Sequence, residues 1–108
     1  MKPWEIWDGP LFGGHPCVIV SNASRVDRKA KVVVLKCTTL TPGTSYQPDA
    51  LHTTLDREDG LDTTTRCECD LFYTLEKAQL KHRRGTVSLE RQRDISRKMV
   101  QGLCLAGI

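Results

Sequence analysis

The spacing of hydrophobic and polar positions changes once along this chain of 108 residues. Up to Val87 the apolar residues form short runs or alternate with polar ones, and a period of two is typical of β-strands. From Ser88 onward they recur every three or four residues, which is typical of an amphipathic helix. The pattern predicts about six short strands and one C-terminal helix. We expect the strands over residues 4–7, 17–20, 31–40, 51–55, 63–73 and 83–87.

The strand over residues 31–40 is the expected centre of the sheet. Its stretch VVVL at 32–35 is an unbroken run of β-branched and aliphatic residues, which indicates a strand covered on both faces. Thr38 and Thr39 follow, where the chain leaves the core for a polar loop. A rigid strand that delivers polar side chains to a loop is a favourable position for a functional site.

Charged and apolar residues alternate along the strand 63–73. Successive side chains of a strand point to opposite faces, so one face is expected to carry charges and the other apolar side chains. The charged face consists of Arg66, Glu68 and Asp70, and the apolar face of Cys67, Cys69 and Leu71. Residues 75–80 are predicted to form a short helix, and residues 21–31 a polar connection with room for one turn of helix.

The C-terminal helix has a plausible start at Ser88, a residue type that often caps helix N-termini. Strands in tandem followed by one helix predict a mainly β fold, with a C-terminal α-helix packed on a small, strongly bent antiparallel sheet or barrel. A chain of this length supports one hydrophobic core, so residues 1–108 are expected to form a single domain. The apolar positions of the helix are Leu89, Ile95, Met99, Val100 and Leu103.

The composition is that of an ordinary folded protein, with 39% hydrophobic and 27% charged residues. No apolar run approaches the roughly 20 residues that span a bilayer, and the N-terminal MKPWEIWDG lacks the apolar core of a secretory signal. We therefore expect a cytoplasmic protein without membrane association. The net charge of +3 is uneven, since nine of the 16 basic residues lie within 66–98. A polyanionic partner on that side and ordinary solvated faces both fit this pattern.

The five cysteines do not indicate a disulfide framework, because their number is odd and no secretory signal precedes them. Cys67 and Cys69 share one face of a strand, and a metal site could recruit Cys37 or Cys17. The sequence contains neither a CxxC pair nor a second spaced pair. We therefore expect buried free thiols, with neither a metal nor a cofactor.

An ordered set of motifs resembles a known family. The set comprises WEIW at 4–7, GHPCVIVS at 14–21, VVLKCTT at 33–39, a stretch at 60–70 that ends in CD, and LEKAQL at 75–80. Over nearly the whole chain it resembles the MazF/PemK toxins of bacterial type II toxin–antitoxin pairs. The resemblance implies a small SH3-like antiparallel barrel with a C-terminal helix, as in the gyrase poison CcdB. It also implies a metal-independent endoribonuclease for single-stranded RNA, a homodimer, and a cognate antitoxin whose acidic segment covers the basic side.

The resemblance also implies site residues. His15 stands directly before a proline, where the family commonly has an arginine, and Thr38 aligns with the family's catalytic Thr or Ser. Members of the PemK type end a strand with Arg, Cys and Asp, and this chain has Glu68 and Asp70 on either side of a cysteine. We therefore predict His15, Thr38 and Asp70 as the catalytic residues, with a glutamate where the second arginine is usual.

Cleaving RNA without a metal requires a base for the 2′-hydroxyl proton, an acid for the leaving 5′-oxygen, and donors or cations for the phosphorane. His15 is predicted to be the base or the acid, because imidazole side chains titrate near neutral pH. Thr38 is predicted to donate to a phosphoryl oxygen, and Asp70 to orient a base or act as one. The predicted substrate-binding residues are Arg66 or Arg25 as the cation, Thr39, and Phe12 as a stacking platform.

Other interpretations stay open at this stage. The same barrel without cleavage could bind a protein target such as gyrase or act as a regulatory subunit, which the missing arginines at 15 and 68 favour. It could also be a structural or interaction module. His15 could be a plain loop residue, Thr38 an ordinary strand residue, and the charges around Glu68 an exposed face.

Overall fold

The computed structural model describes residues 1–43, 47 and 49–104. Three short 3-10 turns, η1 (Leu11–Gly13), η2 (Arg57–Asp59) and η3 (Lys77–Gln79), occur between the longer elements. Among the described residues, no helix is both long enough and apolar enough to cross a membrane. The longer elements are β1 (Glu5–Gly9), β2 (His15–Ile19), α1 (Ala23–Arg28), β3 (Lys31–Thr39), β4 (His52–Leu55), β5 (Thr65–Glu76), β6 (Lys81–Thr86) and α2 (Leu89–Gly102).

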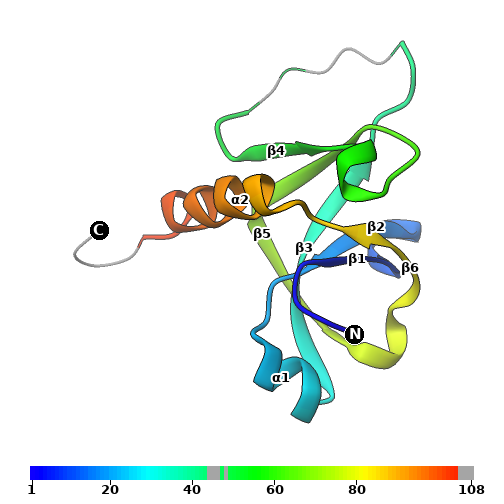
Figure 1. Ribbon diagram of the computed structural model, residues 1–108, viewed down its shortest axis with the longest axis vertical. Helices are drawn as coiled ribbons and strands as arrows, with labels where there is room; N and C mark the ends of the chain where they lie inside the picture. The colour runs from blue at the N-terminus through cyan, green and yellow to red at the C-terminus, as the bar shows by residue number, and fades with distance from the viewer. Residues whose placement is uncertain (44–46, 48, 105–108) are drawn as a thin grey trace.

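The strands of the described part form one antiparallel sheet in the order β4-β5-β3-β2-β1-β6. Figure 1 shows the sheet curling, with α2 lying across β5 and α1 next to the N-terminal end of β3. β3 lies inside the sheet between β5 and β2, so the predicted central strand is confirmed. The predicted fold class, a bent antiparallel sheet with one C-terminal helix, is also confirmed.

β3 contributes to two apolar clusters, one on each side of the sheet. Leu35 and Cys37 belong to the α2-side cluster, which includes Ile95 of α2. Val32 and Val34 belong to the other cluster. The alternation of side chains along a strand explains this division, and it confirms that the strand is covered on both faces. The second group, which we call the α1-side cluster, consists of Cys17, Ile19, Val26, Val32, Val34, Leu75 and Leu80.

The predicted helix over residues 75–80 is wrong. Leu75 and Glu76 extend β5, and the residues after them form only the turn η3. Leu75 lies opposite Val32 of β3 and is 8% exposed. Pairing with the central strand and burial of this leucine outweigh the weak local preference for helix.

A bulge bends β5 near its middle. Leu35 and Cys37, two residues apart on β3, pair with Phe72 and Cys67, so β5 has extra residues at this point. Such an excess bends a strand. Leu71, predicted on the apolar face, lies in the bent part and is 40% exposed, so that prediction is wrong. Both cysteines predicted on the apolar face are fully buried in the α2-side cluster, as expected.

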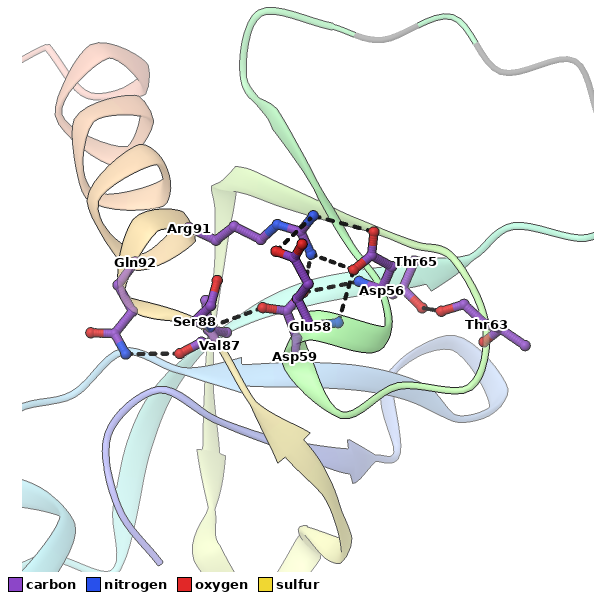
Figure 2. A network of polar contacts seen from close by, with 9 residues as sticks. All are labelled: Asp56, Glu58, Asp59, Thr63, Thr65, Val87, Ser88, Arg91 and Gln92. Carbon is purple, nitrogen blue, oxygen red and sulfur yellow. Dashed lines mark hydrogen bonds and ion pairs between the residues drawn. The ribbon is translucent and has the colours of Figure 1, made fainter.

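The start of α2 is fixed by a polar network with η2 (Figure 2). Arg91 Nη1 lies 2.7 Å from Asp56 Oδ1 and also contacts the buried carboxylate of Asp59. The hydrogen bond with Asp56 raises the pKa of Arg91, and Arg91 lowers the pKa of Asp56. Asp59 accepts a hydrogen bond from the Ser88 backbone N–H over 2.9 Å. Ser88 is the N-cap residue, as predicted, but its hydroxyl makes no capping hydrogen bond within the described part.

Candidate active site

On the side of the sheet that carries the α1-side cluster, the side chains become polar toward the C-terminal end of β3. Lys36 and Thr38 continue the alternation of the buried valines, so they point to the same side of the sheet. Thr38 lies directly opposite Arg66 of β5. Glu68 shares the face of Arg66 because it stands two residues further along the strand. Together with His15, these four residues form what we call the polar cluster.

His15 is the first residue of β2, and its side chain contacts the backbone of β3. Its Nδ1 lies 3.0 Å from the carbonyl oxygen of Cys37. A carbonyl oxygen only accepts, so Nδ1 carries the hydrogen, and in the neutral ring the lone pair is on Nε2. β2 and β3 pair Cys17 with Lys36. Continuing that antiparallel register along both strands places His15 opposite Thr38.

Glu68 lies between the two cations of the cluster. Its Oε1 is 3.4 Å from Arg66 Nη2, and its Oε2 is 3.9 Å from Lys36 Nζ. The residue is 9% exposed, and Oε2 has no hydrogen-bond partner in the part of the chain that is described. Both distances exceed the range of about 2.7–2.9 Å for charge-assisted hydrogen bonds. The cluster thus surrounds a carboxylate oxygen that still has a lone pair to offer.

β4 borders the cluster at the edge of the sheet. His52 lies opposite Glu68, and Thr54 lies opposite Arg66, so these β4 side chains face the same side. Neither they nor Lys36 are among the predicted site residues. Lys36 could have been predicted from the sequence, because it stands two positions before Thr38 on the same strand and therefore points to the same side. The β4 residues require the register between β4 and β5, which the sequence does not supply.

Asp70, a predicted catalytic residue, lies against the end of α2. It is half-buried beside Gly102, where a Cβ atom on the glycine would come within 2.8 Å of the Asp70 Cβ. Among residues 1–43, 47 and 49–104, no hydrogen bond or ion pair joins its carboxylate to the polar cluster. The structure therefore brings His15 and Thr38 together but does not link Asp70 to them.

The predicted substrate-binding residues are distributed over the molecule. Arg66 lies in the polar cluster, and Thr39 is exposed at the end of β3. Arg25 of α1 donates from Nε to the Lys31 carbonyl oxygen over 3.1 Å. Lys31 starts β3 and Thr39 ends it, about 26 Å further along at the usual rise of about 3.3 Å per residue, so Arg25 lies at the opposite end of β3 from Thr39. Phe12 belongs to η1, and its side chain lies outside the described part of the structure.

Comparison with known proteins agrees with this architecture. The profile of one family, described as PemK-like, MazF-like toxin of type II toxin-antitoxin system, matches residues 11–103. The chain belongs to this family. No curated protein matches the sequence at a significant level.

Solved structures of MazF-type toxins have the same fold. An endoribonuclease from a mycobacterial species, solved in complex with its cognate antitoxin, has a TM-score of 0.84 at 23% identity, covering 100% of this chain and 99% of that chain. The Mycobacterium tuberculosis toxin MazF-mt6 has a TM-score of 0.75 at 18% identity, with 91% and 94% covered. MazE–MazF from Deinococcus radiodurans has a TM-score of 0.70 at 12% identity, with 94% and 92% covered.

In this PemK-like, MazF-like toxin, His15 and Glu68 occupy the two positions at which the resemblance implies arginine. Both lie in the polar cluster. Arg66 stands on the same face as Glu68 and contacts it, so β5 still supplies a guanidinium from a neighbouring position.

A cleft of about 720 Å³ lies between β4 and α2 of the toxin. Lys98 Nζ donates to the His52 carbonyl oxygen over 2.6 Å and lies 2.9 Å from Asp94 Oδ2. Asp94 also accepts from the Thr53 hydroxyl over 2.7 Å and pairs with Arg97. Burial raises the pKa of Asp94, but the bonds from Lys98, Thr53 and Arg97 lower it to about 2. Since these charges pair with one another and hold α2 on β4, we assign this cleft a structural role.

Proposed function

We propose that this toxin is an endoribonuclease that cleaves single-stranded RNA without a metal ion, with the polar cluster as its active site. The observation that carries the proposal is the row of His15, Thr38 and Arg66 across β2, β3 and β5. The row combines a group that transfers protons, a hydroxyl donor and a fixed positive charge, which are what the reaction requires. The toxin family and the mycobacterial relatives described as endoribonucleases point to the same activity.

Each member of the row has a chemical task. His15 exchanges a proton with the RNA through Nε2, because Nδ1 is engaged with the backbone of β3. Arg66 binds the scissile phosphate, since a guanidinium matches the geometry of phosphoryl oxygens and stays charged. Lys36 adds a second positive charge from the same face. Thr38 donates its hydroxyl hydrogen to a phosphoryl oxygen.

The substrate is single-stranded, because the attacking 2′-oxygen must lie in line with the leaving 5′-oxygen, and a duplex backbone holds these atoms out of line. Unpaired bases also stack on aromatic side chains at about 1–3 kcal/mol each. Trp7 and Tyr73 pack against the α1-side cluster and are partly exposed, so they offer such surfaces on the side of the sheet that carries the polar cluster.

A cognate antitoxin neutralises the toxin in this proposal. Relatives from mycobacteria and from Deinococcus radiodurans were solved with an antitoxin bound. An acidic segment suits the cations of the polar cluster and the exposed basic residues of β6, Lys81 and Arg83. The toxin is proposed to act in the cytoplasm, where it would meet its antitoxin and its RNA substrate.

The toxin is also proposed to act as a homodimer. Apolar side chains of α2 and of its C-cap remain exposed in the single chain, with Leu89 at 61%, Val100 at 39% and Leu103, the C-cap residue, at 42%. Covering such residues by a second copy is favourable for a small domain. Sedimentation that finds only monomer at high protein concentration would contradict this part of the proposal.

The test is incubation of purified, antitoxin-free toxin with a long single-stranded RNA in EDTA, followed by mapping of the product ends. We expect discrete cuts that persist in EDTA and end in a 2′,3′-cyclic phosphate and a 5′-hydroxyl. His15→Ala and Arg66→Ala should slow the appearance of the cuts by about 100-fold or more, whereas Arg93→Ala, at an exposed position of α2, should leave the rate unchanged. Intact RNA in the presence of folded wild-type toxin would reject the proposal and favour the alternative that the barrel binds a protein target without cleaving RNA.

A further inference from the structure

Cleavage of RNA needs two proton carriers, and the row described above contains one. Besides His15, the polar cluster contains one further group that can take up a proton, the carboxylate of Glu68. We propose that Glu68 is the general base that accepts the 2′-hydroxyl proton and that His15 is the general acid that protonates the leaving 5′-oxygen. The assignment rests on the proposed function, and it gives Glu68 the role that the sequence suggested for Asp70.

The surroundings of Glu68 fit a group that receives a proton. Its two cationic neighbours, Arg66 at 3.4 Å and Lys36 at 3.9 Å, mark it as an ionised carboxylate, which only accepts. Oε2 is buried and has no donor among the described residues. A buried acceptor without a donor is costly, so this oxygen is suited to a hydroxyl hydrogen that arrives with a ligand. The 2′-hydroxyl of RNA is such a donor.

The same cations explain how the substrate reaches Glu68. Arg66 and Lys36 carry long side chains, and their contacts with Glu68 are longer than strong ion-pair bonds. A phosphate that binds these two side chains draws them toward its oxygens and uncovers the carboxylate. The scissile phosphate and the neighbouring 2′-hydroxyl then meet the cations and the base at the same place.

The backbone contact of His15 fits the complementary role. Nδ1 donates to the Cys37 carbonyl oxygen, and this contact is kept when the ring is protonated, because both ring nitrogens then carry hydrogen. The proton on Nε2 is the one that can be given away. Since Glu68 enters the reaction without a proton, the imidazole is the group that must donate one.

The proposed step is balanced. Glu68 takes the proton of the 2′-hydroxyl as the 2′-oxygen forms its bond to phosphorus. The bond between phosphorus and the 5′-oxygen breaks, and the 5′-oxygen takes the Nε2 proton of His15. The products are a 2′,3′-cyclic phosphate and a 5′-hydroxyl, and the proton returns from Glu68 to His15 through water.

A substrate with sulfur in place of the bridging 5′-oxygen at a mapped cleavage site separates the two roles, because a thiolate leaves without protonation. On ordinary RNA, we expect Glu68→Gln and His15→Ala each to slow single-turnover cleavage by about 10²–10⁴-fold. On the sulfur substrate, His15→Ala should recover to near the wild-type rate, and Glu68→Gln should remain slow. Failure of His15→Ala to recover, or recovery of Glu68→Gln, would overturn the assignment.

If Glu68 had a purely structural role, Glu68→Gln would lose RNA binding as well as cleavage. We expect Glu68→Gln to bind an RNA with a 2′-deoxy residue at the cleavage site as tightly as wild type or more tightly, since a negative charge next to the phosphate is removed. Loss of that binding would contradict the inference. Glu76→Gln, the same change at an exposed position of β5, should cleave at the wild-type rate. Cleavage by wild type together with normal cleavage by Glu68→Gln would reject this inference alone, whereas absence of cleavage by wild type would reject the proposed function as well.

Discussion

Thr38 and Arg66 lie directly opposite each other on β3 and β5, so a hydroxyl and a guanidinium occupy one row of the sheet. Directly opposed residues of an antiparallel pair have Cβ atoms about 4.5–5.5 Å apart. That separation allows both side chains to reach oxygens of one phosphate. The two residues are therefore expected to act as a unit on the scissile group.

The first prediction concerns this unit. Arg66→Ala should lower the single-turnover rate of RNA cleavage by about 100-fold, as is typical when one donor to a transition-state anion is removed. Thr38→Val should lower it less, and the double variant should lose less than the product of the two single losses. Independent, multiplicative losses in such a double-mutant cycle would show that the two residues do not share a phosphate.

Asp70 provides the second prediction. Its Cβ atom lies beside Gly102 of α2, and its carboxylate has no hydrogen bond or ion pair to the polar cluster within the described chain. We expect Asp70→Asn to reduce the cleavage rate less than tenfold, well below the loss for Glu68→Gln. Measuring both variants in one cleavage assay checks this order. A larger loss for Asp70→Asn would restore the catalytic role that the family resemblance implies.

The third prediction concerns pH and the contact between α2 and β4. Against the effect of burial, hydrogen bonds from Lys98, Thr53 and Arg97 lower the pKa of Asp94 to about 2 in the folded protein, from its ordinary value of 3.8. Its contribution to stability, about 2 kcal/mol, is therefore present above pH 4 and is lost as the pH falls toward 2. Asp94→Asn should destabilise the toxin by about this amount at pH 7 and hardly at all at pH 2. Urea unfolding at both pH values measures the difference, and an equal loss at both would refute it.

The network between η2 and α2 gives the fourth prediction. Arg91 is the partner of the buried Asp59 carboxylate, whose side chain is 0% exposed. Arg91→Met would leave that charge buried without a cation and should lower the free energy of unfolding by about 3–5 kcal/mol. Arg93→Met, at an exposed position of the same helix, is the control. If Arg91→Met lowered the free energy of unfolding by less than about 1 kcal/mol, the network would contribute little to stability.

The fifth prediction concerns the cysteines. Cys17, Cys37, Cys67 and Cys69 are buried, and Cys104 is exposed. Burial, with a smaller effect of Asp8, raises the pKa of Cys17 to about 12. The hydrogen bond with Cys37 raises the pKa of Cys67, and the hydrogen bond with Cys67 raises the pKa of Cys69. Only thiolates that the reagent can reach react readily. A thiol reagent at pH 8 should therefore label Cys104 of the folded toxin quickly, and all five cysteines after denaturation. Fast labelling of Cys104→Ser would contradict this.

The parts of the fold that follow from periodicity were predictable from the sequence. The run VVVL identifies the central strand, and the change of period at Ser88 identifies α2. The segment 75–80 was not predictable, because its structure is decided by Leu75 pairing with Val32 on a distant strand. The exposure of Leu71 likewise depends on the bulge in β5, which local sequence does not reveal.

The candidate site was predictable to a similar degree. His15, Thr38 and Arg66, which the structure brings together, were all among the predicted residues, because motif order and strand alternation indicate positions at the ends of paired strands. Asp70 lies among the extra residues of the bulge in β5, between the paired residues Cys67 and Phe72, so alternation alone does not place it. Arg25 is close in sequence to the second strand but lies at the opposite end of β3. The contribution of β4 depends on a register between strands, which a single sequence does not determine.

The position of Cys37 has a consequence for genetics. Its side chain belongs to the apolar core, while its carbonyl oxygen holds the imidazole of His15. One residue is therefore shared by the packed interior and the proposed active site. A core substitution that shifts the Cys37 backbone by a few tenths of an ångström therefore changes the orientation of the His15 imidazole, although no residue of the polar cluster is replaced. We therefore expect substitutions in the core around Cys37 to weaken this toxin although every residue of its surface is unchanged.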